Sequence, residues 1–191
     1  MVSTTFFALL AASFAVATPL SRQLTGNTTE VPLVTKAVAV MTGFGSDANG
    51  TVYFTQTTPD GPVNVTGTIF NLDPNAWRGF HIHQYGDLTN GCDSTGGHYN
   101  PFNQTHGGRY SAVRHAGDLG NIQSDNDGTA EFSFTANMLD LSAEYSIIGR
   151  AIVVHAGTDD LGLGKTANSS INGNSGARIA CGVIGLTPSG M

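Results

Sequence analysis

Between residues 63 and 70, apolar side chains alternate with polar ones, and this pattern limits the fold more than any other feature of the chain. Val63, Val65 and Ile69 would share one face of an extended segment, with Asn64 on the other, because successive side chains of a strand point to opposite faces. This period of two predicts a strand with one buried face. The chain shows no amphipathic helix pattern, so strands are expected to form most of the fold.

The remaining strand candidates are short and are separated by turn residues. Glycine is frequent, with 25 residues in a chain of 191, and only 12% of the residues are charged. This composition suits short strands joined by many turns, and the length suits one compact domain. Seven or eight such strands predict an all-β fold, an antiparallel sandwich or barrel. The other strand candidates are residues 37–41, 51–55, 79–84, 130–135, 147–154 and 179–185.

Two long segments, residues 86–117 and 156–177, interrupt the spacing of the strands. Long segments without regular structure in a compact domain are usually functional or disordered. These two contain or border four of the six histidines, both cysteines and Arg178. We therefore expect two long functional loops.

The N-terminal part of the chain has the pattern of a secretory signal. Residues 6–17 form an apolar run that is too short to span a bilayer as a helix. The run ends in Ala-Val-Ala at residues 15–17, a small-x-small pattern that signal peptidase accepts. A buried N-terminal strand or helix is the alternative. We expect a signal peptide at residues 1–17, a flexible segment at 18–35 and one folded domain at 36–191.

Two further features fit a secreted protein of the extracellular space or cell wall. The even number of cysteines favours a disulfide between Cys92 and Cys181 over two buried free thiols. Five Asn-x-Ser/Thr triplets are candidate glycosylation sites. A second apolar stretch or hydrophobic tail is absent from the sequence, so no membrane anchor is expected. The candidate glycosylation sites are Asn27, Asn49, Asn64, Asn103 and Asn168.

The charge of the chain argues against a nucleic-acid partner. The formal net charge is -6, and the sequence contains no run of Lys and Arg. Binding to a phosphate backbone needs a basic footprint, which this composition does not supply.

The first group of histidines belongs to the strand candidates. His81 and His83 are two residues apart on one strand, so both imidazoles lie on the same face and can reach one ion. His155 closes another strand candidate and would reach the same face if the two strands are neighbours. Histidine is a common ligand of copper and zinc. Half-exposed strand histidines without a metal are the alternative.

The second group lies in the first long loop. His98, His106 and His115 are followed by Asp118, three residues after the last histidine. Three imidazoles and one carboxylate make a closed tetrahedral zinc site. Taken singly, each is more often a solvated loop histidine, but all six histidines of the chain fall into these two ligand-like groups.

Two kinds of charged residue accompany the histidines. Asp159 and Asp160 follow His155 closely, and a carboxylate there would accept the second ring N–H of metal-bound histidines and fix their tautomers. Solvated loop acids are the alternative. Arg178 lies three residues before Cys181, where a disulfide would hold it near the metals. An anchored Arg beside an open metal position suits a small anionic substrate, and an ordinary surface ion pair is its alternative.

Taken together, these residues resemble the copper/zinc superoxide dismutases over about residues 36–188. The shared motifs follow one another in the same order along nearly the whole predicted domain, which makes the resemblance highly specific. The motifs are residues 79–83 (GFHIH), 91–92 (GC), 97–101 (GHYNP), 106–108 (HGG), 115–121 (HAGDLGN), 148–150 (IGR), 154–155 (VH), 159–162 (DDLG) and 173–185 (GNSGARIACGVIG).

The resemblance implies an eight-stranded Greek-key barrel or sandwich with a bridging His98 between two metals. It implies an intradomain disulfide of Cys92 with Cys181, and a role for Arg178 in drawing superoxide toward copper. Asp159 resembles the acid that links a copper histidine to a zinc histidine. The implied copper ligands are His81, His83, His98 and His155, and the implied zinc ligands are His98, His106, His115 and Asp118.

The implied activity converts two superoxide anions and two protons into O2 and H2O2, with His98 and Arg178 as catalytic residues. A secreted copper-only dismutase and a non-catalytic copper/zinc-binding module of the same fold are the alternatives. A homodimer fits the family pattern around Gly149 and Val183, and a plain core is an equal alternative for these small and apolar residues. Many relatives carry charges in the second loop, whereas residues 165–173 here contain no carboxylate, so we expect altered salt dependence of the rate.

Overall fold

The computed structural model describes residue 1 and residues 34–188 of the chain. The predicted signal peptide, most of the predicted segment 18–35 and Asn27 lie outside the described residues. The first strand begins at Lys36, where the predicted domain begins. Among the residues described, no helix is long and apolar enough to cross a membrane.

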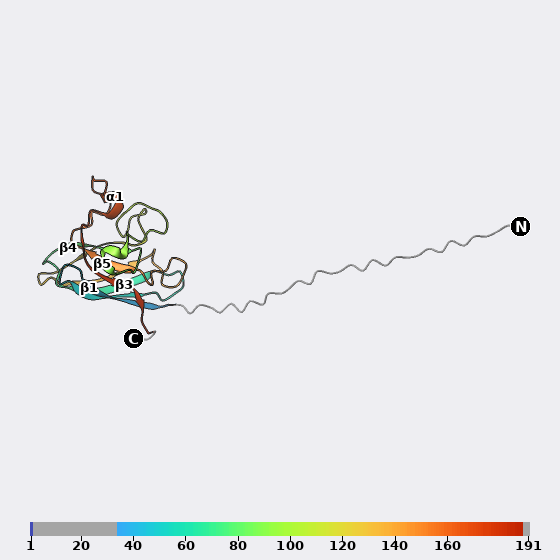
Figure 1. The fold of residues 1–191 in the computed structure, drawn as a ribbon, viewed down its shortest axis with the longest axis horizontal. Coiled ribbons are helices and arrows are strands. Elements are labelled where there is room, and N and C mark those ends of the chain that lie inside the picture. The colour runs from blue at the N-terminus through green and yellow to red at the C-terminus, as the bar shows by residue number, and fades with distance from the viewer. Residues whose placement is uncertain (2–33, 189–191) are drawn as a thin grey trace. The chain divides into compact units, whose positions relative to one another are not determined.

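Short strands account for nearly all the regular structure in residues 34–188. The helical elements are a 3-10 helix, η1, and a four-residue α-helix, α1 (Figure 1). The strands are β1 (Lys36–Gly43), β2 (Asn49–Thr55), β3 (Val63–Phe70), β4 (Trp77–His83), β5 (Thr89–Cys92), β6 (Asp118–Gln123), β7 (Ala130–Ala136), β8 (Ala151–His155), β9 (Arg178–Val183) and β10 (Gly185–Leu186), and the helices are η1 (Asp93–Thr95) and α1 (Ser169–Asn172).

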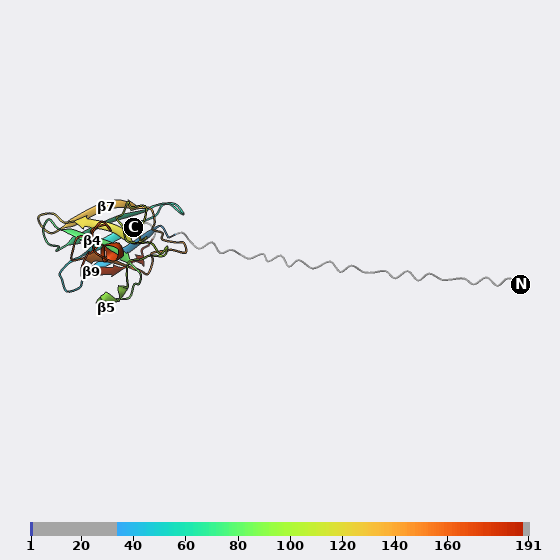
Figure 2. The same ribbon diagram turned by 90° about the horizontal axis from the view of Figure 1, so that it is seen from above.

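Eight of these strands form one antiparallel, nearly closed barrel in the order β6-β4-β8-β9-β1-β2-β3-β7. Several neighbours are not consecutive in sequence: β4 pairs with β8, β9 with β1, and β3 with β7. These crossovers give the Greek-key arrangement. The short β10 pairs with β1, and β5 lies at the rim beside β9 (Figure 2). The predicted eight-stranded antiparallel fold is confirmed.

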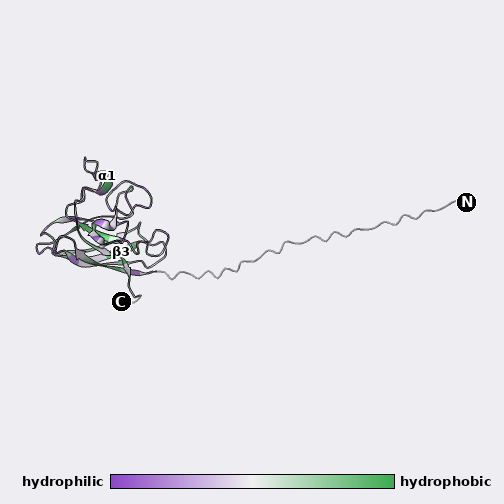
Figure 3. Ribbon diagram, viewed as in Figure 1, coloured by the Kyte–Doolittle hydropathy of each residue, from purple (hydrophilic) through white to green (hydrophobic). Residues whose placement is uncertain are grey.

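The alternation between residues 63 and 70 appears in the burial of β3. Val63, Val65 and Ile69 are fully buried in the barrel core, whereas Asn64 is exposed. Hydrophobic residues line the strands (Figure 3). Gly67 leaves room on the inner side for the ring of Phe132 from β7, since a Cβ at this glycine would lie 2.8 Å from that ring.

One strand prediction is wrong at its start. The segment predicted as residues 147–154 becomes extended only at Ala151, because residues 147–150 form a turn. The backbone N–H of Arg150 donates to the carbonyl of Ile147 at 3.1 Å, and Gly149 adopts a φ of 79°. Glycine accepts this left-handed conformation without strain, whereas a strand needs extended backbone.

Three strands were not among the sequence candidates. Residues 118–123 form β6, although their sequence, DLGNIQ, has no regular alternation. Residues 89–92 and 185–186 form β5 and β10. Short strands of this kind are defined by their pairing partners rather than by their own composition, and the sequence does not state the partners.

The two long loops cover one side of the barrel next to β4 and β8. The first loop, predicted as residues 86–117, contains β5 and is tied to β9 by the disulfide between Cys92 and Cys181, whose Cα atoms are 5.7 Å apart. The second loop carries α1 and rises above the barrel strands in Figure 1. A backbone hydrogen bond from His106 to the carbonyl of Ser170, at 2.9 Å, joins the two loops.

Candidate metal centre

Strand β4 sends its histidines to the side of the barrel that the loops cover. Phe80 and Ile82 belong to the barrel core, so the alternating residues His81 and His83 point the other way. Both histidines are nonetheless buried, with exposed fractions of 0% and 1%, because the loops lie over them. The neighbouring strand β8 ends in His155, which reaches the same face.

The first histidine group directs four ring nitrogens toward one point. Nδ1 of His83 donates to the carbonyl of Gly96 at 2.9 Å, and Nδ1 of His155 donates to that of Gly176 at 3.1 Å. Donation by Nδ1 leaves Nε2 unprotonated in a neutral imidazole, and the two Nε2 atoms lie 3.2 Å apart. The group consists of His81, His83, His98 and His155, whose ligand atoms lie within 4.8 Å of one another.

Two further nitrogens of this group lack any hydrogen-bond partner. They are Nδ1 of His81 and Nε2 of His98, both buried. Buried polar atoms are nearly always satisfied, and an unsatisfied set indicates a site for a water or an ion. Four converging imidazole nitrogens with inward lone pairs fit a cation such as copper.

The second group surrounds a carboxylate. Nδ1 of His98, His106 and His115 lies 2.9, 3.0 and 3.1 Å from Oδ1 of Asp118. The close nitrogen of His106 makes no hydrogen bond there, so the approach is better explained by a shared ion than by a proton. The donor set is the closed tetrahedral type that zinc prefers.

The loop backbone holds Asp118 in place. Its second oxygen, Oδ2, accepts hydrogen bonds from the backbone N–H of Gly107 at 3.0 Å and of His115 at 2.9 Å. Asp118 is 1% exposed and begins β6, which pairs with β4 across from His81. The second group, which we call the zinc-type group, is thereby held next to β4, the strand that carries His81 and His83.

Asp159 lies between the two groups. Its Oδ2 accepts from Nε2 of His81 at 2.9 Å, and its Oδ1 accepts from Nε2 of His106 at 2.8 Å. Donation by each Nε2 leaves Nδ1 unprotonated and facing its metal group, which is how outer carboxylates orient metal-bound histidines. The amide of Asn121 fixes the backbone of Asp159 through two hydrogen bonds of 2.8 and 2.9 Å. The neighbouring Asp160 instead binds Ser169 and Asn174 within the second loop.

Burial keeps the first group neutral. It lowers the pKa of His81 and of His83 well below the usual value, and the adjacent His98 lowers both further. Burial also lowers the pKa of His98, and it lowers that of His155 to about 4. Neutral imidazoles are the form that binds metal.

The second group has the opposite electrostatics. Burial lowers the pKa of His106, but the neighbouring carboxylates of Asp118 and Asp159 outweigh it and raise the pKa to about 9. Burial would raise the pKa of both carboxyl groups, yet their histidine neighbours hold it below the usual range. The buried carboxylates of Asp118 and Asp159 therefore favour a positive charge beside His106, and a divalent cation would supply it.

Arg178 lies beside the first group. It pairs with His155 in the register of β8 and β9. Its guanidinium donates to the carbonyls of Cys92 at 2.7 Å and Gly96 at 2.7 Å, and to the hydroxyl of Thr95 at 2.9 Å. The side chain is partly exposed, so the guanidinium of Arg178 provides a positive charge at a fixed position between solvent and the first histidine group, which we call the copper-type group.

Sequence reasoning missed several residues that hold this centre together. The carbonyls of Gly96 and Gly176 and the hydroxyl of Thr95 position histidines or Arg178, but backbone carbonyls leave no signal in a sequence. Asn121 was part of a shared motif without an assigned role. Its position within β6 is what brings it to Asp159.

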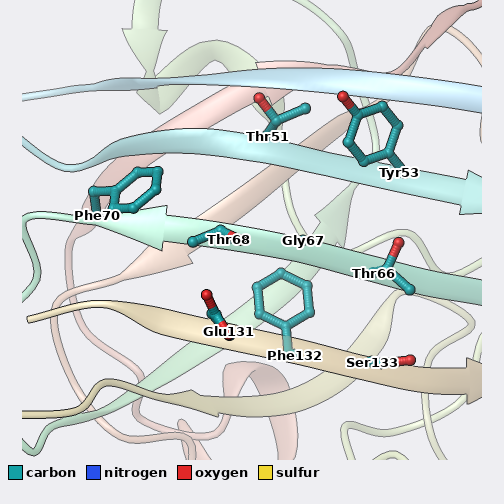
Figure 4. A pocket seen from close by; sticks show the side chains of 9 residues that line it. All are labelled: Thr51, Tyr53, Thr66, Gly67, Thr68, Phe70, Glu131, Phe132 and Ser133. Carbon is teal, nitrogen blue, oxygen red and sulfur yellow. The ribbon is translucent and has the colours of Figure 1, made fainter.

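A broad hollow of the described surface lies away from the histidines. A depression of about 750 Å³ runs over the outer face of β2, β3 and β7 (Figure 4). Glu131 is its one acidic lining residue, and threonines and aromatic rings make up most of the rest. A small anion that reacts at a metal needs little space, so the tight histidine centre is the better candidate site.

A barrel with two adjoining histidine groups that share one imidazole defines a two-metal protein with a copper-type and a zinc-type site. The family model for copper/zinc superoxide dismutase (SODC) matches residues 48–184. Similar proteins include the superoxide dismutases [Cu-Zn] of Yarrowia lipolytica, Cryptococcus neoformans var. grubii and Saccharomyces cerevisiae, at 53%, 51% and 49% identity over 152 residues. Each match covers 80% of this chain and 98% of the relative.

The chain therefore belongs to the copper/zinc superoxide dismutase family. It is an oxidoreductase, a superoxide dismutase with copper and zinc as cofactors.

Proposed function

We propose that this chain is a secreted superoxide dismutase in which one copper and one zinc share the imidazole of His98. The observation that carries the proposal is that His98 belongs to both groups. Its Nδ1 faces the Asp118 group, and its Nε2 faces the first group. Copper would be held by His81, His83, His98 and His155, and zinc by His98, His106, His115 and Asp118.

Bound copper would supply the one-electron redox chemistry that the disproportionation of superoxide needs. The protein supplies the proton handling. Nε2 of His98 is buried and makes no hydrogen bond, so it is the atom at which this chain can hold a proton between the two halves of the cycle. Nδ1 of the same ring lies 2.9 Å from Oδ1 of Asp118, so the zinc-type group would keep the ring oriented whether or not Nε2 holds a proton.

Arg178 serves as the binding site for the anion. Its guanidinium is fixed by carbonyls of the first loop rather than by a carboxylate, so its positive charge remains available to a negative substrate. Fixed donors that need no rearrangement are the efficient way to stabilise charge at a reacting centre. The exposed loop residues 163–168 contribute only Lys165 as a charged side chain, so steering rests mainly on Arg178 and the metal.

Metal content and superoxide disproportionation measured on one purified sample test the enzymatic part. The expected result is one copper and one zinc per chain together with rapid disproportionation. One copper and one zinc without activity would favour the alternative, a non-catalytic metal-binding module of the same fold. Copper alone would favour a copper-only enzyme, which the intact zinc-type group argues against.

Secretion is supported by the apolar run at residues 6–17 and by the Ala-Val-Ala pattern that follows it. Four of the five glycosylation triplets lie in the described part, and the asparagines of all four are exposed: Asn49, Asn64, Asn103 and Asn168. Expression of the full chain in a eukaryotic secretory host should place the protein in the medium, trimmed after about residue 17 and smaller after N-glycan removal. Retention in cells with an intact N-terminus would contradict the proposal.

A homodimer through the face around Gly149 and Val183 is part of the proposal. Val183 is 38% exposed on β9, and Gly149 is exposed in the turn before β8. Light scattering on the purified protein should report two chains, and Val183→Glu should give one. Val40→Glu, at a 67% exposed valine of β1, is the matched control and should leave the dimer intact.

A further inference from the structure

The hydroxyl of Thr95 lies at the junction between a histidine of the copper-type group and the anion-binding arginine. Thr95 ends η1 and is fully buried. Its Oγ1 lies 2.8 Å from the carbonyl of Cys92, 3.1 Å from Nδ1 of His83 and 2.9 Å from Nη1 of Arg178. The mechanism described above gives this hydroxyl no role.

The chemistry of the three partners fixes the direction of each hydrogen bond. A hydroxyl has one hydrogen to donate and two lone pairs that accept. The carbonyl of Cys92 only accepts, so the hydroxyl donates to it, and a guanidinium only donates, so the hydroxyl accepts from Arg178. One lone pair remains for His83, whose Nδ1 must therefore carry the hydrogen. That tautomer leaves Nε2 of His83 free for the metal.

His83 and Arg178 also share a second acceptor, the carbonyl of Gly96. Nδ1 of His83 lies 2.9 Å from this oxygen, and Nη2 of Arg178 lies 2.7 Å from it. The imidazole and the guanidinium are thus tied to the same pair of neighbouring oxygens. The Thr95 hydroxyl is the member of that pair that belongs to a side chain, and substitution can remove it.

We propose that Thr95 is a positioning residue that, together with the Gly96 carbonyl, fixes the tautomer and ring orientation of His83 and holds Arg178 at a set place beside it. A movement of the first loop would then move the anion-binding guanidinium of Arg178 and the metal ligand His83 together. The inference rests on the proposed binding of copper by His83.

The test compares four proteins, each loaded with copper and zinc: wild type, Thr95→Val, Thr95→Ser and Ser94→Ala. Valine keeps the shape of threonine without the hydroxyl, and serine restores the hydroxyl. Ser94 is the matched control in the same helix, because its hydroxyl lies 3.0 Å from the carbonyl of Asp87 and 3.2 Å from that of Gly91 and donates its one hydrogen there instead. Electron paramagnetic resonance of Cu(II) reports ligand geometry independently of turnover.

Thr95→Val should shift the copper resonance parameters and lower the second-order rate constant at low salt roughly tenfold, the effect of losing one hydrogen bond to a charged group. Thr95→Ser should restore both, and Ser94→Ala should match wild type in both. A Thr95→Val spectrum identical to wild type overturns the proposal, and so does a changed spectrum that serine fails to restore.

A second measurement uses wild-type protein and does not depend on a variant that folds. Nitrogen-15 NMR of the reduced, fully loaded protein should show Nδ1 of His83 protonated, and an unprotonated Nδ1 overturns the proposal. Wild-type protein that binds both metals without turnover would defeat the proposed function alone, since the resonance spectra would still decide the role of Thr95.

Discussion

His81 and His106 are held by opposite oxygens of one carboxylate, that of Asp159, at 2.9 and 2.8 Å. One histidine belongs to the copper-type group and the other to the zinc-type group. A single buried side chain from the second loop therefore orients one ligand in each site. The two sites are coupled by this carboxylate on one side and by the ring of His98 on the other.

Asp159→Asn should weaken the binding of both metals. An amide presents one accepting oxygen, so one of the two Nε2–H donors loses its acceptor. Loss of such an outer partner typically costs about 10- to 100-fold in metal affinity. Competition with a chelator, followed by metal analysis, measures the change. Asp160→Asn is the matched control, because that carboxylate binds Ser169 and Asn174 rather than histidines, and it should retain wild-type affinity.

Removal of both metals should lower the melting temperature strongly. The metal-free protein must bury imidazole nitrogens that have no partner, among them Nδ1 of His81 and Nε2 of His98. An ion present at a thousandfold excess over its dissociation constant stabilises the folded state by about 4 kcal/mol, which corresponds to about 10 °C for a domain of this size. Calorimetry before and after chelation measures the shift, and added zinc should restore part of it. An unchanged melting temperature would contradict the predicted sites.

Arg178→Ile should lower the second-order rate roughly tenfold at low ionic strength, because removing a charged partner costs about 1.5 kcal/mol or more. It should also flatten the dependence of the rate on salt, since screening acts on the charge that was removed. Arg178→Lys keeps the charge but cannot make the forked contacts with Cys92 and Gly96, so its rate should be intermediate. Pulse radiolysis at several salt concentrations measures all three. No change in Arg178→Ile would exclude its steering role.

The double variant Cys92→Ser with Cys181→Ser should be less stable by about 4.6 kcal/mol, the chain-entropy value for a loop of this length. The cross-link spans a sequence separation of 89 residues. It also fixes the start of the first loop, where the carbonyl of Cys92 binds Arg178, so activity should fall as well. Urea unfolding measures the stability, and reduced wild type should behave like the variant. Equal stability of all forms would contradict this account.

The strands that have their own pattern were predictable from the sequence. Alternation between residues 63 and 70 set the burial of β3, and the two-residue spacing put His81 and His83 on one face. The grouping of the six histidines with Asp118 likewise followed from local spacing and from resemblance. These features depend on strand geometry, which acts between near neighbours in the chain.

Tertiary structure decided the rest, because it depends on pairing between distant segments. DLGNIQ becomes β6 only because β4 lies beside it, and the turn at Gly149 delays β8 to Ala151. The local pattern left Asp159 and Asp160 both open, and only the resemblance singled out Asp159; its position between the two sites depends on two hydrogen bonds between the side chain of Asn121 and its backbone. Hydrogen bonds to the Gly96 carbonyl and the Thr95 hydroxyl exist only once the first loop has closed over β4, and a sequence pattern carries no record of such contacts.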